Sequence, residues 1–176
     1  MRLFIASVPQ ILSKILLLGV LFSAISSSCY AQFLNKKWPS ATLITPNKKE
    51  IEVSWAISPM EKVQGLSDLD KSKMQKHEGL FFYYPIDEQR VFWMPSTKFN
   101  LDIIFLNREL KVVGLEENVP HFPKRSPDKD IPRTKSYYSR YVLELHAGMA
   151  KVFAIKKGDF LKWKSPNKVM KIFKSL

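Results

Sequence analysis

Short runs of aromatic and β-branched residues, separated by prolines, glycines or charged turns, are the feature that most limits what this chain can fold into. In Ile51–Ile57, apolar residues alternate with polar ones at a period of two, which is typical of a half-buried strand. Further runs follow at close spacing, namely Gly79–Pro85, Arg90–Met94, Leu101–Leu106, Leu110–Val119 and Arg140–Gly148. They predict an α+β, β-dominated domain built on a compact, mostly antiparallel sheet or barrel.

Two or three short helices are expected beside this sheet. Ser58 precedes Pro59 and is followed three residues later by Glu61, so the sequence predicts a capping box at the start of a short helix. One or two helical turns are expected in Met149–Ile155. A last helix is expected in residues 165–176, "SPNKVMKIFKSL", where Ser and Pro suit a helix start.

The N-terminus has the order of a secretory signal peptide. Lys14 precedes the apolar run Ile15–Ile25, and small residues lead to Ala31. An apolar run of this length forms about 16 Å of helix, roughly half of a bilayer core. We expect cleavage after Ala31 and a periplasmic or secreted protein. An uncleaved anchor and a lipoprotein anchored at Cys29 are the alternatives.

These patterns divide the chain into four segments. Residues 1–31 are the expected signal peptide, 32–40 a linker, 41–164 a single β-rich domain and 165–176 a basic amphipathic helix. Cys29 is the only cysteine, so a chain cleaved after Ala31 has no disulfide, thiolate nucleophile or sulfur ligand.

The sequence predicts neither a metal site nor a cofactor. The three histidines, His77, His121 and His146, do not lie at metal-ligand spacing. A metal held by Glu144, His146 and a third ligand is the alternative, because positions i and i+2 share one face of a strand. There is no phosphate-binding glycine loop and no nucleophilic-serine motif.

The net charge of +12, from 28 basic and 16 acidic residues, favours an anionic partner. Export makes an anionic membrane surface or an envelope polyanion the expected partner, and not nucleic acid. In the last helix, apolar residues gather on one side and lysines on the other, so it either docks on its own domain or lies on a membrane. The lysines with candidate membrane contacts are Lys162, Lys164, Lys168, Lys171 and Lys174.

The segment "FWMPSTKFNLD", Phe92–Asp102, contains most of the candidate site residues. Trp93 offers a stacking surface, Thr97 a hydroxyl and Asp102 an acid within an apolar strand. Glu144 is a second acid of that kind. Asp102 is also open to a structural interpretation, in which it accepts backbone N–H bonds from the bend between the two runs. Glu144 is open to one in which it lies on a solvated sheet face or pairs with a Lys or Arg across strands.

The motifs "VQGLSDL", "EGLFFYYP", "FWMPSTKFNLDIIFLN", "VVGLEENVP" and "YVLELHAGMAKVFAIKKGD" occur in that order from about Ile51 to Lys164. Together they resemble the family named domain of unknown function 192. The chain departs from the family pattern at Gln64, Pro95-Ser96 and Phe99-Asn100. The resemblance implies a compact β-rich domain, often exported, and no particular reaction.

The leading hypothesis is an exported, non-enzymatic binding module whose ligand contacts Trp93, Thr97, Asp102 and Glu144, with no catalytic residue identified. A hydrolase that uses Asp102 and Glu144 as a carboxylate pair is the first alternative. A purely structural envelope protein is the second. A shared cleft would favour the hydrolase, whereas two acids satisfied by backbone groups would favour the structural role.

Overall fold

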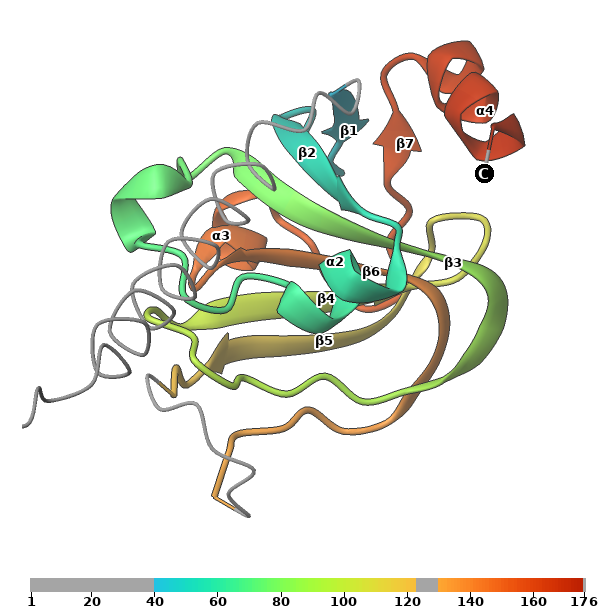
Figure 1. The fold of residues 1–176 in the computed structure, drawn as a ribbon. Coiled ribbons are helices and arrows are strands. Elements are labelled where there is room, and N and C mark those ends of the chain that lie inside the picture. The colour runs from blue at the N-terminus through green and yellow to red at the C-terminus, as the bar shows by residue number, and fades with distance from the viewer. Residues whose placement is uncertain (1–39, 123–129, 176) are drawn as a thin grey trace, which may run out of the picture. The chain divides into compact units, whose positions relative to one another are not determined.

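The computed structural model describes residues 40–122 and 130–175 and arranges them around one seven-stranded sheet that curls into a half-barrel (Figure 1). The strand order is β5-β4-β6-β3-β2-β1-β7. The strands are β1 (Ala41–Ile44), β2 (Glu50–Ala56), β3 (Glu78–Arg90), β4 (Leu101–Leu106), β5 (Val112–Val119), β6 (Tyr137–His146) and β7 (Lys162–Trp163). The predicted β-dominated α+β class and mostly antiparallel sheet are confirmed.

Short helices accompany the sheet in the described residues, namely α2 (Pro59–Gln64), the 3-10 helix η1 (Lys71–Lys73), α3 (Met149–Val152) and α4 (Pro166–Lys174). The predicted capping box is present at α2. The backbone N–H of Glu61 donates to the Ser58 hydroxyl at 3.3 Å, and that of Ser58 donates to the Glu61 carboxylate at 2.9 Å. None of the helices in the described part of the chain combines the length and apolarity that crossing a membrane requires.

The pairing of β2 with β3 is parallel, whereas the other strand pairs in the described sheet are antiparallel. A parallel pair needs a crossover connection, because the chain must return to the starting end of the first strand. Residues 57–77 form that crossover and contain α2 and η1. The parallel pair therefore places α2 against one face of the sheet.

The two faces of the sheet differ in what covers them. We name one the core face, where α3 and α4 pack through Met149, Val169 and Ile172 on a large apolar cluster. The sheet residues of that cluster include Leu43, Val53, Trp55, Phe81, Ile104, Leu106, Leu143 and Leu145. We name the other the site face, on which the strand register places Phe82, Ile103, Phe105, Val142 and Glu144.

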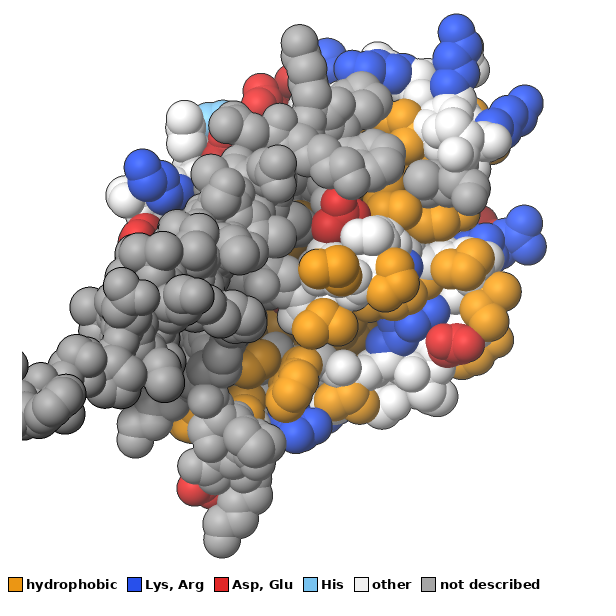
Figure 2. All heavy atoms as spheres, viewed as in Figure 1, with side chains coloured by type: hydrophobic (Ala, Val, Ile, Leu, Met, Phe, Trp, Pro, Cys, Tyr) orange, Lys and Arg blue, Asp and Glu red, His pale blue; other side chains and the backbone are white. Residues whose placement is uncertain are grey.

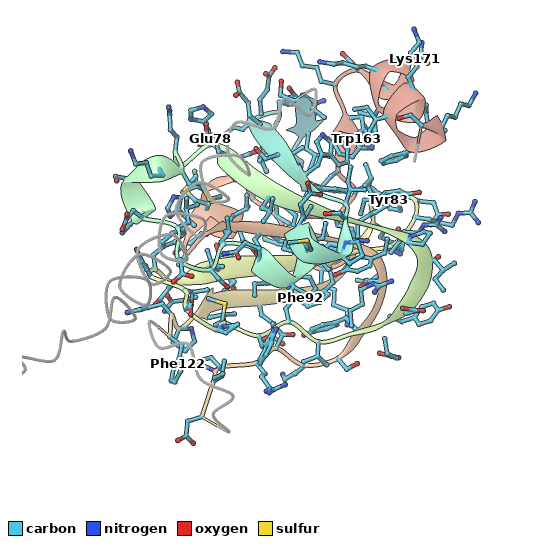
Figure 3. All side chains as sticks on the ribbon, viewed as in Figure 1. Glu78, Tyr83, Phe92, Phe122, Trp163 and Lys171 are labelled. Atoms are coloured by element: carbon cyan, nitrogen blue, oxygen red, sulfur yellow. The ribbon has the colours of Figure 1, made fainter. Side chains whose placement is uncertain are left out.

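Helix α4 is docked on the core face. Val169 and Ile172 are buried, and the ring of Phe173 lies 4.8 Å from Tyr83 and 5.8 Å from Trp55, centroid to centroid. Lys171 points away from the sheet (Figure 3). The structure therefore shows the docking alternative for this helix, with Val169, Ile172 and Phe173 against its own domain and Met170 half exposed.

The predicted strand Arg90–Met94 is wrong beyond its first residue. Arg90 ends β3, and the following residues form only an isolated bridge between Trp93 and Arg133. The Met94 N–H donates to the Pro132 carbonyl at 3.1 Å. Pro95 has no N–H to donate, and it forms only another isolated bridge, a parallel one to Phe122.

Strand β3 also runs through Pro85, where the sequence predicted an end. The register between β3 and β6 shifts between Tyr83 and Glu88, and a proline is tolerated at such an irregularity because it has no ladder bond to make there. The short strand β1 was not predicted. The expected signal peptide, the cleavage after Ala31, the Cys29 anchor and residues 32–39 of the linker lie outside the described residues, so they stay predictions.

Candidate functional site

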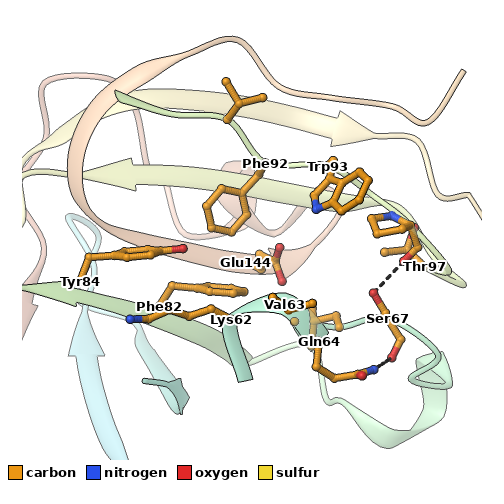
Figure 4. A pocket seen from close by; sticks show the side chains of 14 residues that line it. Lys62, Val63, Gln64, Ser67, Phe82, Tyr84, Phe92, Trp93, Thr97 and Glu144 are labelled. Atoms are coloured by element: carbon orange, nitrogen blue, oxygen red, sulfur yellow. Dashed lines mark hydrogen bonds between the residues drawn. The ribbon is translucent and has the colours of Figure 1, made fainter. Parts of the chain in front are cut away.

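A cavity of about 240 Å³ opens on the site face, between the α2 crossover, β3 and the segment that follows β3 (Figure 4). Its lining residues come from three parts of the chain that are far apart in sequence. They are Lys62, Val63, Gln64, Gly65, Leu66, Ser67, Phe82, Tyr84, Val91, Phe92, Trp93, Pro95, Thr97 and Glu144. The structure thus brings three of the four predicted site residues together, since Trp93, Thr97 and Glu144 all line this cavity.

Aromatic rings form much of the cavity wall. The rings of Phe82 and Phe92 meet edge to face, with centroids 4.9 Å apart. Trp93 is 44% exposed and lies at the mouth, together with the exposed residues Val63 and Val91. Figure 2 shows hydrophobic side chains gathered on this side of the molecule. An exposed tryptophan beside exposed aliphatic residues is a surface on which a flat or cyclic ligand can stack.

Glu144 is the acid at the centre of the cavity lining (Figure 4). Its residue is only 4% exposed, and its Oε2 atom has no hydrogen-bond partner among the described residues. Burial raises the pKa of this carboxyl from 4.5 to about 8, because the charged form is the one that loses water. At neutral pH Glu144 is therefore mainly an uncharged carboxylic acid, which is able to donate a hydrogen bond.

Gly65 lets the end of α2 pass close to this carboxyl group. Its φ is +48°, a conformation that favours glycine. A Cβ at this position would lie 3.4 Å from the Phe82 ring and 3.9 Å from Glu144 Oε2. These are ordinary van der Waals distances, so the positive φ, and not a lack of space, favours glycine beside the unpaired oxygen.

Positive charges surround the aromatic rings at the cavity. The Arg90 guanidinium lies 3.5 Å from the centroid of the Tyr84 ring, and the Lys62 ammonium lies 4.5 Å from it. The Arg133 guanidinium lies 5.2 Å from the Trp93 centroid. Burial lowers the pKa of Lys62, and the charge of Arg90 lowers it further. These contacts are cation–π interactions that stabilise the wall and make the cavity surroundings electropositive.

Thr97 shapes the wall through its own hydrogen bonds. Its hydroxyl donates to the Met94 carbonyl at 2.9 Å and accepts from the Phe122 N–H at the same distance. The Ser67 hydroxyl donates to the Pro95 carbonyl at 2.7 Å and connects the bend to the α2 side of the cavity. Both hydroxyl groups therefore hold the backbone around the cavity.

Asp102 lies away from the cavity. It is fully buried, and its two carboxylate oxygens accept from the N–H groups of Asn118 at 2.9 Å and Ala150 at 2.8 Å. Ala150 is in the first turn of α3, whose N-cap, Gly148, has no side chain. The Asp102 carboxylate thus caps α3 from a neighbouring strand. A backbone-binding role was one prediction, but these partners are not in the predicted 95–100 bend.

The strand register also separates the two acids. Asp102 pairs with Leu145 and Glu144 pairs with Ile103 across β4 and β6. Directly opposite residues of an antiparallel pair point to the same face, and successive residues to opposite faces. Asp102 and Glu144 therefore point to opposite faces of the sheet. A hydrolase mechanism with these two as a carboxylate pair has no shared cleft in which to act.

Replacing Asp102 with asparagine is expected to lower the free energy of unfolding by about 2–4 kcal/mol. Hydrogen bonds to charged groups contribute about 1.5–3 kcal/mol each, and the amide nitrogen would face an N–H donor. Urea denaturation measures this change. Ligand binding in the cavity should stay unchanged, because Asp102 lies on the other face. An unchanged midpoint with lost ligand binding would move Asp102 into the site.

In the described residues, the histidines do not add metal ligands to the cavity. The Nε2 of His146 lies 2.8 Å from the Met74 carbonyl, and its ring packs 4.6 Å from Phe99. Elsewhere, donor atoms of Glu52, His77 and Glu78 lie within 4.8 Å of one another, a group that the sequence did not reveal because it forms across the β2–β3 pairing. Proximity on an exposed surface is common without an ion, so this group does not define a site.

These features define a β-dominated half-barrel domain with an aromatic cavity and a buried carboxyl group. The family model DUF192, described as "Uncharacterized ACR, COG1430", matches residues 42–163. The chain belongs to this family, as the resemblance predicted.

Two solved structures are similar to this chain. One is a proposed transcription regulator from Sinorhizobium meliloti 1021, with 26% identity, a TM-score of 0.57 and coverage of 70% of this chain and 92% of that chain. The other is a protein of unknown function from Novosphingobium aromaticivorans DSM 12444, with 25% identity, the same TM-score and coverage of 70% and 84%. No curated protein matches the chain.

Proposed function

We propose that this domain is a non-enzymatic binding module for a small cyclic molecule, held in the cavity between Trp93 and Glu144. The observation that carries the proposal is the unpaired oxygen of Glu144, which is buried at the cavity. A buried polar atom without a partner is costly, and a ligand that supplies the missing hydrogen bond recovers that cost on binding.

The size of the cavity supports a small ligand. Its volume of about 240 Å³ is below the range of about 300–1,000 Å³ found for drug-sized ligands. The half-exposed Trp93 and the edge-to-face pair of Phe82 and Phe92 offer apolar surface for one ring. Glu144 adds a polar contact at a fixed place. Apolar walls with few placed polar groups are the usual composition of a small-molecule site.

We favour binding over hydrolysis because the Asp102 carboxylate does not face Glu144. Carboxylate-pair hydrolysis needs separations of about 5–9.5 Å across a common cleft. The opposite directions of the two side chains in the β4–β6 register remove that arrangement. A purely structural role leaves the unpaired oxygen of Glu144 without an explanation.

Ligand binding is expected to stabilise the wild-type chain and not the Trp93→Ala variant. The measurement is thermal shift with a panel of envelope sugars and small cyclic compounds. A ligand at 100 times its Kd adds about 2.7 kcal/mol of stability. The matched control is Phe160→Ala. Like Trp93, Phe160 is a half-exposed aromatic residue with a cation near its ring, since the Lys111 ammonium lies 5.6 Å from the ring centroid, but it lies outside the cavity. Equal shifts in all three proteins would contradict a site at Trp93.

On sequence grounds, the proposal also includes an exported location and an anionic macromolecular partner. The signal-like N-terminus supports a periplasmic or secreted module, with a Cys29 lipid anchor as the alternative. The net charge of +12 supports contact with an anionic membrane surface or envelope polyanion. In the described structure, Lys164 pairs with Glu50 at 2.7 Å and Lys168 donates to the Ser40 carbonyl. Lys162, Lys171 and Lys174 are the exposed lysines that remain for such contacts.

A further inference from the structure

We infer that the ligand presents an uncharged hydrogen-bond acceptor, a carbonyl or hydroxyl oxygen, to Glu144, which acts as the donor. The site then selects neutral ring compounds over organic cations. This inference rests on the proposed function, since it names the class of molecule that the cavity binds. It follows from the surroundings of one oxygen atom and from the signs of the charges near it.

Glu144 Oε2 has no hydrogen-bond donor beside it among the described residues. An ionised carboxylate that is buried needs hydrogen-bond donors or a positive partner to offset its lost hydration. Gly65, whose Cβ position lies 3.9 Å from this oxygen, has no side chain, and the Phe82 ring lines the same cavity. The site is built for the neutral acid, and a neutral acid has one proton to donate.

Charged groups of both signs lie on the elements packed around Glu144. Helix α2 contributes Glu61 and Lys62, β3 contributes Tyr84, Arg90 and Glu88, which pairs with Arg90 at 3.4 Å, and β6 contributes His146 on the same face. Apart from Glu144, Lys62 is the charged residue that lines the cavity itself. The segment 91–97 contains no titratable side chain. Asp102 on β4 faces the other way. The charge that a ligand meets in the cavity beside Glu144 is therefore the positive Lys62, which repels a cationic ligand.

The aromatic rings also favour a neutral ligand. A cationic ligand would need ring faces for cation–π contact, as in the aromatic cages that bind quaternary ammonium groups. Here Tyr84 already has Arg90 and Lys62 over it, and Trp93 has Arg133. A neutral ring does not depend on a cation–π contact, so the cations already placed on these rings do not exclude it. The geometry and the charges therefore agree on a neutral ligand.

The pH dependence separates the two kinds of ligand. Below pH 8 the Glu144 carboxyl is protonated and the donor is present, because burial raises its pKa to about 8. An acceptor ligand then binds at full strength at low pH and weakens as the pH rises through 8. A cationic ligand would do the opposite, since it needs the ionised form. At pH 9.5 only about 3% of the acid keeps its proton, so binding of an acceptor weakens about 30-fold.

The experiment uses three probes of matched shape: benzamide, which is neutral, benzamidinium, which is a cation, and benzoate, which is an anion. Ligand-observed NMR titrations give their Kd values at pH 6 and pH 9.5, and circular dichroism of the same samples gives the folded fraction to which each Kd is referred. We expect benzamide to bind most tightly at pH 6 and to lose about 30-fold by pH 9.5 in the wild type. In Glu144→Gln, whose amide donates at both pH values, benzamide binding should not depend on pH.

Each contrary outcome has a distinct meaning. Benzamidinium that binds more tightly than benzamide, and gains affinity as the pH rises, overturns the inference and leaves the binding module in place. Benzoate that binds more tightly than benzamide at pH 6 overturns the requirement for a neutral ligand. If none of the three binds, the inferred ligand class is overturned as well. The proposed function fails separately, when thermal shifts of the wild type and Trp93→Ala agree for every compound. The wild-type pH profile alone tests the inference if Glu144→Gln does not fold.

Discussion

The Glu144→Gln variant is expected to keep its stability as the pH rises from 4.5 to about 8, while the wild type loses a large part of its own. The pKa of this carboxyl is raised from 4.5 to about 8 by burial, so the folded state binds the proton more tightly than the unfolded state. The resulting stability is fully present below pH 4.5 and is lost as the pH rises through 8. A shift of this size corresponds to on the order of 5 kcal/mol, comparable with the whole stability of a small domain.

Urea denaturation at steps between pH 4 and pH 9 measures this difference. The Gln variant removes the titrating proton and keeps nearly the same shape, so its curve should lack the loss between pH 4.5 and pH 8. Glu117→Gln is the matched control, because it removes an exposed carboxyl group from β5 and should follow the wild type. Parallel curves for the wild type and Glu144→Gln would show that Glu144 is ionised in the folded protein, and the neutral-donor model of the cavity would then be wrong.

Much of the sheet could be predicted because local patterns determine it. The alternation in Ile51–Ile57 and the buried run Leu101–Leu106 correspond to β2 and β4. Arg90–Met94 has a similar composition and is not a strand, because its neighbour is the irregular segment around Arg133 and not a strand edge. Composition describes which residues suit a strand, whereas a partner decides whether the strand forms.

The candidate site could be predicted only in part, for a similar reason. An acid within the apolar run of β6 and a tryptophan before a proline bend are visible in the sequence, and Glu144 and Trp93 do lie at one cavity. The opposite wall, which includes Lys62 and Gly65, comes from α2. Its position depends on the parallel β2–β3 pairing, which no local pattern reveals. In this wall Gly65 lies beside Glu144, and a lone glycine in the sequence does not indicate a ligand contact.

Asp102 shows the converse case, in which a conspicuous residue has a structural role. An acid between Leu101 and Ile103 attracts attention as a possible site residue. Its carboxylate instead connects β4 to β5 and to the start of α3 through two backbone N–H groups. In the sequence, Asp102 and Glu144 look alike. In the structure, the Asp102 carboxylate accepts two hydrogen bonds, whereas Glu144 Oε2 has no partner among the described residues. Only the three-dimensional partners separate the scaffold residue from the candidate site residue.

The basic C-terminal helix is docked on its own domain and still presents lysines to solvent. Val169, Ile172 and Phe173 pack on the core face, so they are not free to insert into a bilayer, whereas Met170 is half exposed. Lys171 and Lys174 remain exposed on α4, and Lys162 is exposed just before it. Any membrane contact of this helix would therefore be electrostatic, with about 1 kcal/mol for each lysine near an anionic surface. Stability and surface binding then depend on different residues of one helix.

Truncation after Trp163 is expected to lower the free energy of unfolding by about 5 kcal/mol and to unfold much of the protein. It removes Val169, Ile172 and Phe173 from the core face, and a buried side chain of this kind contributes about 1.5–3 kcal/mol. The double variant Lys171→Gln/Lys174→Gln should instead keep its stability and bind anionic vesicles about 30-fold more weakly at low salt.

The complementary variant is Ile172→Ala, for which we expect a loss of about 2–4 kcal/mol in stability and unchanged vesicle binding by the fraction that stays folded. Urea denaturation and vesicle co-sedimentation at low and high salt measure the two properties on the same samples. Equal pelleting of the double lysine variant and the wild type would eliminate the membrane proposal for this helix. A truncated chain as stable as the wild type would contradict the packing of α4 on Trp55 and Tyr83.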